Sequence, residues 1–262
     1  MVGTAGTAVR VMPGLRGALG FLTAVGGAAV PDRRSVVWFG PVGALVGLLV
    51  GLVWRGAGEL WPPLVAALLT VVADAALTGM LHYDGLADTA DGLLPPLDRT
   101  RRLAVLSDPQ AGAFAVVVVP LVLGLQVAAF ASMAPDPWLV VGLWAAARAA
   151  MGVTLATVPY ARARAAGSDG GAGGAASTAG LASAFVGTSP WPSVVVGAAA
   201  LAVAGVAQGW PGGPTAAAAL VAGFGGVMAL AHRRLGGFTG DVLGAAGVVG
   251  QTCALVVAAA RW

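Results

Sequence analysis

Residues 111–134 read A-G-A-F-A-V-V-V-V-P-L-V-L-G-L-Q-V-A-A-F-A-S-M-A and contain no charged side chain. A helix rises about 1.5 Å per residue, so a helix of this length crosses the roughly 30 Å hydrocarbon core of a bilayer. Backbone hydrogen bonds in lipid must be made inside the chain, which a helix does. The run therefore predicts a transmembrane helix.

The rest of the chain repeats this pattern. Of its 262 residues, 58% are hydrophobic and 10% are charged, and the mean hydropathy is +0.87. This composition excludes an ordinary soluble domain, and the many small residues favour packed helices over a β-barrel. We predict one all-α, polytopic membrane domain over residues 1–262. Its seven predicted spans are about 36–54, 61–81, 111–134, 138–160, 191–208, 214–231 and 241–260.

Two further segments are neither spans nor short turns. The apolar run at residues 19–30 is too short to cross a bilayer comfortably, and we interpret it as an N-terminal interfacial or half-inserted helix. The same run superficially resembles a signal peptide, which is the alternative interpretation. Residues 167–180 are rich in Gly, Ala and Ser and indicate a flexible linker, with a lid over the site as the alternative.

The basic residues orient the predicted bundle. All 14 are arginines, and Arg148 is the one that falls inside a span. Arg55 and Arg261 lie on one side of the bundle, and the remaining arginines outside the spans all lie on the opposite side. The positive-inside rule then places the N-terminus and residues 82–110 in the cytoplasm and the C-terminus outside a plasma (inner) membrane. Scattered arginines give no basic patch, so nucleic acid binding is not indicated.

An acidic stretch interrupts this apolar sequence. Residues 82–92 read H-Y-D-G-L-A-D-T-A-D-G. In a helix, Asp84, Asp88 and Asp91 share one face, where like charges repel. Such a pattern indicates a bound cation, and carboxylates suit Mg²⁺, which shares itself with substrate phosphates. A solvated acidic loop is the alternative. We expect the chemistry at residues 82–112.

Neighbouring residues extend this candidate site. Gly85 and Gly92 leave backbone open to a phosphate, and His82 is a candidate base or ligand. Asp108 is expected either to cap the next helix or to join the metal ligands. Asp241 opens the last span on the same side and is expected to meet the acidic stretch.

Several basic and buried charges also need partners. Arg99, Arg101 and Arg102 follow the acidic stretch and suit phosphate oxygens, although arginines there also act as topology determinants. Asp74 and Arg148 lie inside predicted spans, where charges are costly. We expect them to pair with each other or, for Arg148, to reach toward a bound anion.

With these residues in view, the chain resembles the adenosylcobinamide-GDP ribazoletransferase family, also called cobalamin-5'-phosphate synthases. The resemblance rests on L-T-G-M-L-H-Y-D-G-L-A-D-T-A-D-G-L at residues 77–93 and on S-D-P-Q-A-G-A-F at residues 107–114. F-L-T at residues 21–23 and G-F-T-G-D-V-L-G-A at residues 237–245 also match family signatures. Tyr83 departs from the pattern, which has an aliphatic residue there.

The resemblance implies an activity in cobalamin (vitamin B12) biosynthesis. Such enzymes transfer the phosphocobinamide group of adenosylcobinamide-GDP to a hydroxyl of α-ribazole or α-ribazole 5'-phosphate, release GMP and depend on Mg²⁺. By this resemblance Asp84, Asp88 and Asp91 hold the metal, and one of them or His82 accepts the hydroxyl proton. Arg99, Arg101 and Arg102 would contact phosphate. The resemblance implies no particular oligomeric state, and an oligomer remains one of the alternatives.

Three other functions share some of these sequence features. A CDP-alcohol phosphotransferase has a similar acidic motif, but Asp88 stands at its arginine position and Leu97 at its glycine position. A proton-coupled transporter could use Asp74, Arg148 and Asp241, although the carboxylates cluster at one edge instead of crossing the bilayer. A non-catalytic membrane subunit is the third alternative, and it would tolerate Asp88→Asn.

Overall fold

The computed structural model describes residues 5–25, 31–162, 185 and 187–261. It confirms the all-α membrane bundle: within these residues, the β pairing is limited to one isolated bridge between Tyr160 and Phe238. Six helices are long and apolar enough to cross a membrane. They are α2 (Phe39–Leu60, preceded by the short helix η1, Val36–Trp38), α6 (Ala113–Ser132), α7 (Pro137–Thr157), α10 (Trp191–Gln208), α11 (Gly212–Leu235) and α12 (Gly240–Ala258).

The span predicted at residues 61–81 ends at a sharp bend. α3 (Pro63–Thr78) and α4 (Leu81–Leu93) meet at 91°, a geometry that fits either one broken span or a re-entrant loop. Gly79 and Met80 form the break with φ of 61° and 57°, a left-handed conformation that is uncommon for a residue other than glycine. The helix predicted over residues 61–81 is therefore observed as α3, which starts two residues later and ends three residues earlier. The acidic stretch is itself a helix packed against α6 and α12.

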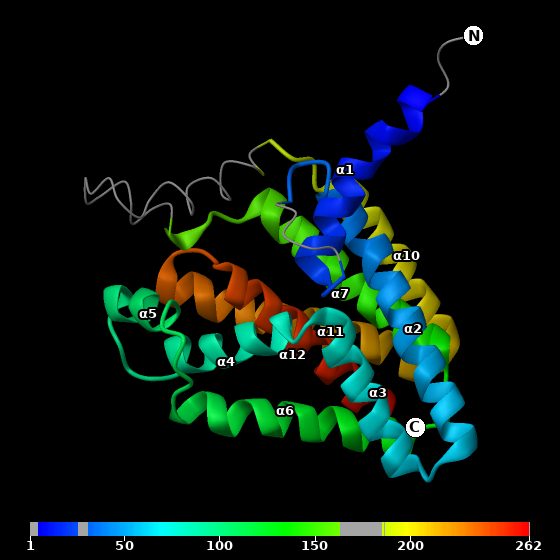
Figure 1. Ribbon diagram of the computed structural model, residues 1–262. Helices are drawn as coiled ribbons and strands as arrows, with labels where there is room; N and C mark the ends of the chain where they lie inside the picture. Colours follow the sequence, from blue (N-terminus) through cyan, green and yellow to red (C-terminus); the bar gives the residue numbers. More distant parts are fainter. Residues whose placement is uncertain (1–4, 26–30, 163–184, 186, 262) are drawn as a thin grey trace.

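The helices form two groups joined by α7 and α12. Figure 1 shows α4, α6, α11 and α12 running side by side, with α2, α7 and α10 in the other group. Glycines at a spacing of four residues let α2 and α7 approach closely. A side chain at Gly43 would meet the Trp144 carbonyl at 2.7 Å, and one at Gly47 would meet the Val140 carbonyl at 2.7 Å. Small residues at such spacing are typical of helix pairs in membranes.

A buried polar network lies where α3, α4, α6 and α7 meet. Asp74 accepts a hydrogen bond from Trp144 Nε1 at 2.6 Å. The Tyr83 hydroxyl lies 3.1 Å from the other Asp74 oxygen and 2.8 Å from Gln126 Oε1, and Gln126 donates to Thr252 at 2.9 Å. The phenol that departs from the family pattern thus anchors the first turn of α4 to α3 and α6.

The N-terminal helix does not belong to the spans. α1 (Ala5–Leu22) begins well before the apolar run at residues 19–30 and packs its end against α2 and η1. Only the first part of that run is helical, and residues 26–30 lie outside the described residues, as does the tract at 167–180. α1 is not among the helices that could cross a membrane.

Candidate functional site

The acidic helix α4 lies directly against the start of α12. A side chain at Gly85 would approach the Asp241 carbonyl oxygen to 2.7 Å, and one at Gly92 would approach Leu106 Cγ to 2.7 Å. Both glycines therefore make room for neighbouring protein. Our expectation that they leave backbone open to a phosphate is not what the structure shows, because Asp241 and Leu106 occupy that space.

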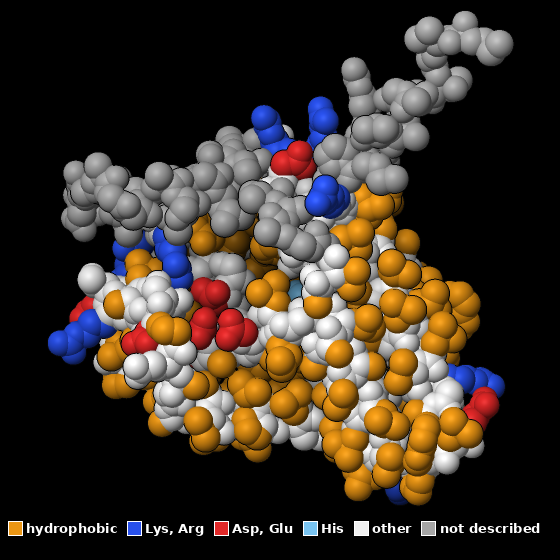
Figure 2. Space-filling model, in the orientation of Figure 1, with side chains coloured by type: hydrophobic (Ala, Val, Ile, Leu, Met, Phe, Trp, Pro, Cys, Tyr) orange, Lys and Arg blue, Asp and Glu red, His pale blue; other side chains and the backbone are white. Residues whose placement is uncertain are grey.

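Close packing brings the carboxylates of α4 and α12 together, as expected for Asp241. A pocket of about 200 Å³ is lined by Asp84, Asp241 and His82, with apolar and glycine neighbours. Asp88 lies in the electrostatic field of Asp84, Asp91 and Asp241. Figure 2 shows acidic side chains gathered on this part of the surface, close to arginines. The pocket mouth is thus strongly negative.

Asp91 differs from the other two carboxylates of α4. Its Oδ2 accepts a hydrogen bond from the Gly112 N–H at 2.6 Å, and its Oδ1 accepts from Phe114 and Ala115 at 3.1 and 3.2 Å. These are backbone N–H groups at the start of α6, which have no partners inside their own helix. Asp91 is therefore a capping side chain supplied by another helix, with both oxygens already engaged.

The donor set suits a hard divalent cation, although the ligands are not assembled. Among the described residues, no group of three or more His, Cys, Asp or Glu side chains is arranged to hold a metal. Mg²⁺ commonly uses only one or two carboxylates and takes its remaining ligands from water and substrate phosphates. Asp84 and Asp241 supply such oxygens at the pocket, and Asp88 lies in their electrostatic field, so the residues fit the expected ion.

Asp108 does not take its expected role as the cap of α6. Its side chain is exposed and accepts a hydrogen bond from the Gln110 N–H at 3.0 Å. It shapes the turn before α6 and leaves the cap of that helix to Asp91.

Two of the three candidate phosphate arginines donate hydrogen bonds to backbone carbonyls of the protein. Arg102 is buried and donates to the Gly92 and Leu93 carbonyls at 2.9 and 2.8 Å, at the C-terminus of α4. Arg99 donates to the carbonyls of Leu235 and Ala161. Cations stabilise helix C-termini, where carbonyls lack partners. The short helix α5 (Arg99–Val105) thus pins α4 and α11.

Arg101 is the exposed member of this group. It faces Asp98 one turn away at 3.9 Å, and its side chain is 77% exposed. An exposed pair of this kind contributes little to stability. Of the three arginines, Arg101 therefore has a side chain free to reach a ligand.

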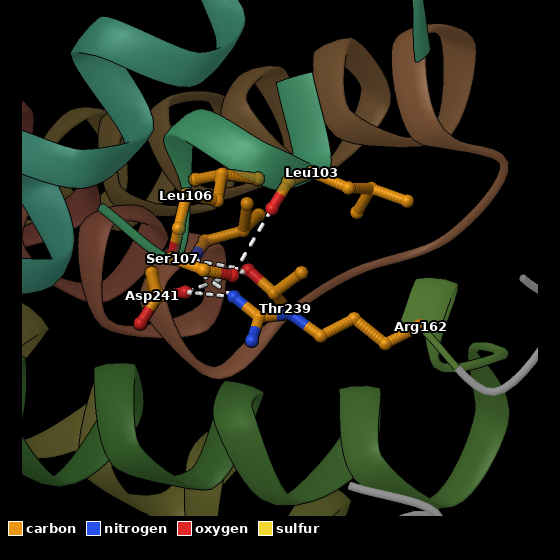
Figure 3. A network of polar contacts seen from close by, with 7 residues as sticks. Leu103, Leu106, Ser107, Arg162, Thr239 and Asp241 are labelled. Carbon is orange, nitrogen blue, oxygen red and sulfur yellow. Dashed lines mark hydrogen bonds and ion pairs between the residues drawn. The ribbon is translucent and has the colours of Figure 1, made fainter. Parts of the chain in front are cut away.

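Sequence reasoning missed Arg162, which it counted only as a topology arginine. Its Nη2 donates to the Leu106 carbonyl at 2.9 Å and lies 3.5 Å from Asp241 Oδ2. Figure 3 shows Arg162 and Thr239 both pointing toward the Asp241 carboxylate. Nearby, burial raises the pKa of the Tyr160 phenol, which stays neutral beside this pair. Arg162 is thus the cation at the edge of the acidic pocket.

His82 and Arg148 lie deeper. Both are buried, and His82 Nδ1 and Arg148 Nη1 have no hydrogen-bond partner. Arg148 and Asp74 act on each other electrostatically, but none of the ion pairs among the described residues joins them. The expected direct pairing of these two charges is therefore not observed.

Fold and site together define a class of protein: a helical membrane protein with a pocket lined by carboxylates. The chain belongs to the cobalamin-5-phosphate synthase family, because the sequence model of that family matches residues 14–259. This confirms the family resemblance and speaks against the CDP-alcohol phosphotransferase and transporter alternatives.

Relatives with curated names agree with this membership. The chain is 37% identical to an adenosylcobinamide-GDP ribazoletransferase of Bradyrhizobium diazoefficiens, over 96% of this chain and 95% of the relative. It is 34% identical to a protein of the same name from Chlorobaculum tepidum, over 96% and 94% of the two chains. No solved structure shows significant similarity to the chain.

Proposed function

We propose that this protein is an adenosylcobinamide-GDP ribazoletransferase that acts in cobalamin biosynthesis. The observation that carries the proposal is a pocket lined by Asp84 and Asp241, with Asp88 in the electrostatic field of both. The chain that holds this pocket matches the family over residues 14–259. The substrates are adenosylcobinamide-GDP and α-ribazole or its 5'-phosphate. The reaction takes place at the arginine-rich end of the bundle, which we assign to the cytoplasmic face of the plasma membrane.

The reaction is a displacement at phosphorus. A hydroxyl oxygen of the ribazole attacks the phosphorus that carries the cobinamide, a new P–O bond forms, and the P–O bond to the GMP phosphate breaks. The hydroxyl proton passes to a base, for which Asp84, Asp88 and His82 are the candidates, and GMP leaves with the electron pair of the broken bond. The protein must align the reacting atoms and balance the charge of the diphosphate.

Mg²⁺ is the cofactor that we expect, held by Asp84 and Asp88 with Asp241 beside them. When bound, it neutralises phosphate charge and orients the diphosphate. Without a cation, the carboxylates would repel that diphosphate. Asp91 holds α4 against α6 and acts as a positioning residue, while Arg162 offers a positive charge at the pocket edge.

The test uses purified full-length protein in lipid vesicles or detergent. Adenosylcobinamide-GDP, α-ribazole 5'-phosphate and Mg²⁺ should give GMP and a cobalamin product, both measured by chromatography and mass spectrometry. Asp88→Asn should lose this activity, whereas Glu59→Gln should keep it, because Glu59 is exposed and pairs with Arg55. If the folded wild-type protein in lipid vesicles forms no GMP from these substrates, the proposal is rejected.

A further inference from the structure

Three buried polar side chains, one on the wall of the acidic pocket and two deeper in the bundle, each have an atom without a hydrogen-bond partner. His82 on α4, Arg148 on α7 and Gln251 on α12 are 4%, 2% and 1% exposed. Their atoms Nδ1, Nη1 and Nε2 make no hydrogen bond. Leaving a buried donor unpaired is costly, and more so for a charged one in a membrane protein. Such groups indicate a place that a ligand completes.

The three groups follow one face of α12. Gly244 lies against His82, whose Cδ2 would be 3.7 Å from an added side chain, and Gly247 lies against Arg148, whose Nη1 would be at 4.0 Å. Gln251 follows one turn later on the same face. His82 also lies in the electrostatic field of Arg148. The groups therefore form one column that leads from the pocket into the bundle.

Met151 separates the pocket from the lower part of this column. It lines the pocket together with His82 and Gly244. Its terminal methyl fills the space that Gly247 leaves open, at 2.2 Å from where a side chain there would begin. Methionine is unbranched and has three rotatable bonds, so it can move aside at low cost. A rotation of Met151 would connect the pocket with Arg148.

The chemistry of the column suits an anion. Arg148 and Gln251 present N–H donors, and the guanidinium is always charged. Asp74, the carboxylate that interacts electrostatically with Arg148, already accepts hydrogen bonds from Trp144 and Tyr83. Arg148 therefore keeps donor capacity for a ligand oxygen. A phosphate group meets this requirement better than a neutral base or a ribose.

We propose that the pocket continues past Met151 into a buried phosphate subsite formed by Arg148 and Gln251, with His82 on its wall. This proposal rests on the proposed function and assigns the subsite to the 5'-phosphate of the ribazole acceptor. The reacting diphosphate lies at the mouth beside Asp241, and Gly247 lies about 9 Å farther along α12 at a rise of about 1.5 Å per residue. A phosphate at that depth is separate from the diphosphate.

The test compares two acceptors, α-ribazole 5'-phosphate and α-ribazole, by their kcat/KM. Arg148→Gln should lower the value for the phosphorylated acceptor about 10- to 100-fold, the loss of one or two charge-assisted hydrogen bonds. The value for α-ribazole should stay within about threefold. Met151→Phe, which blocks the passage without changing charge, and Gln251→Leu should shift the same ratio. These two variants carry the test where Arg148→Gln does not fold.

An unchanged ratio in all three variants would overturn the proposal and leave Arg148 as a counter-charge for Asp74. A higher KM for adenosylcobinamide-GDP with both acceptors would place the donor's phosphate in the subsite and overturn the acceptor assignment. Calorimetry with inorganic phosphate, on the wild type and Arg148→Gln, tests the subsite even in a protein that forms no product. Weaker phosphate binding by the variant supports the subsite, and equal binding rejects it.

Discussion

Asp91 Oδ2 accepts a hydrogen bond from the Gly112 N–H at 2.6 Å, which ties the end of the acidic helix to the start of α6. The two residues depend on each other, because a side chain at Gly112 would lie 2.6 Å from Asp91 Oδ1. Two of the family motifs, at residues 77–93 and 107–114, are therefore in direct contact. A carboxylate expected to hold metal instead fixes the helix that carries the metal candidates.

Loss of this contact should destabilise the protein. Asp91→Ala leaves three backbone N–H groups without their acceptor and should lower the free energy of unfolding by about 1–3 kcal/mol. Gly112→Ala should have a similar effect because its methyl group collides with the same carboxylate. The double variant should cost less than the sum of the two, since both remove one interaction. Thermal denaturation in detergent measures these effects.

The matched control for Gly112→Ala is Gly124→Ala in the same helix. A side chain at Gly124 meets nothing within 4 Å, and alanine favours the helix by about 0.5–1 kcal/mol. This control should be neutral or stabilising. Equal denaturation temperatures for Gly112→Ala and Gly124→Ala would contradict the proposed cap.

Removal of Mg²⁺ should affect the wild type and an Asp88 variant differently. Mg²⁺ bound to the folded protein should raise its denaturation temperature, because a ligand of the native state stabilises it. Asp88→Asn should lose most of that rise. In chelator, however, the variant should be no less stable than the wild type, because it removes repulsion among the carboxylates.

The control for the Mg²⁺ effect is Glu59→Gln, since Glu59 is exposed and pairs with Arg55 outside the acidic pocket. Its response to Mg²⁺ should equal that of the wild type. A full Mg²⁺ response in the double variant Asp84→Asn, Asp88→Asn would exclude these two residues as metal ligands.

Arg101 and Arg102 should give opposite results despite being neighbours in the chain. Arg102→Ala removes a buried guanidinium from the Gly92 and Leu93 carbonyls and should cost about 1.5–3 kcal/mol of stability. Arg101→Ala should change stability by less than about 0.5 kcal/mol. Thermal denaturation, together with the KM for adenosylcobinamide-GDP, separates the two roles. If Arg101→Ala raises that KM at unchanged stability, Arg101 contacts the nucleotide or its phosphates.

Local sequence patterns predicted the fold well for the helices that cross the membrane, because a spanning helix needs a long apolar run. The span at residues 191–208 has the bounds of α10, and the spans of α6 and α12 are close to theirs. The span predicted at residues 61–81 matches α3 to within three residues, but the left-handed bend at Gly79 and Met80 that follows α3 was not predicted. Hydropathy reports burial in lipid, and it carries no signal for a left-handed pair of residues.

Contacts between distant elements explain the remaining misses in the site. Arg162 pairs with Asp241, and Tyr83 reaches Gln126, across long stretches of chain. The spacing of residues along one helix cannot reveal such pairs. The meeting of Asp241 with the acidic helix was predictable, because topology alone brings both to one end of the bundle. Which carboxylate caps a helix and which faces the pocket depended on packing.

The orientation of the bundle is open to a direct test by cysteine labelling. The single cysteine, Cys253, is replaced by alanine, and one new cysteine is then placed in either Ser107→Cys or Ala134→Cys. Both positions are exposed, and they lie beyond opposite ends of α6. The arginine distribution predicts that Ser107 faces the cytoplasm and Ala134 the outside. In intact cells, a membrane-impermeant maleimide should therefore label the Ala134 variant alone, whereas opened cells should show both labelled. Labelling of the Ser107 variant alone in intact cells would reverse the orientation and place the acidic pocket outside, away from cytoplasmic nucleotides.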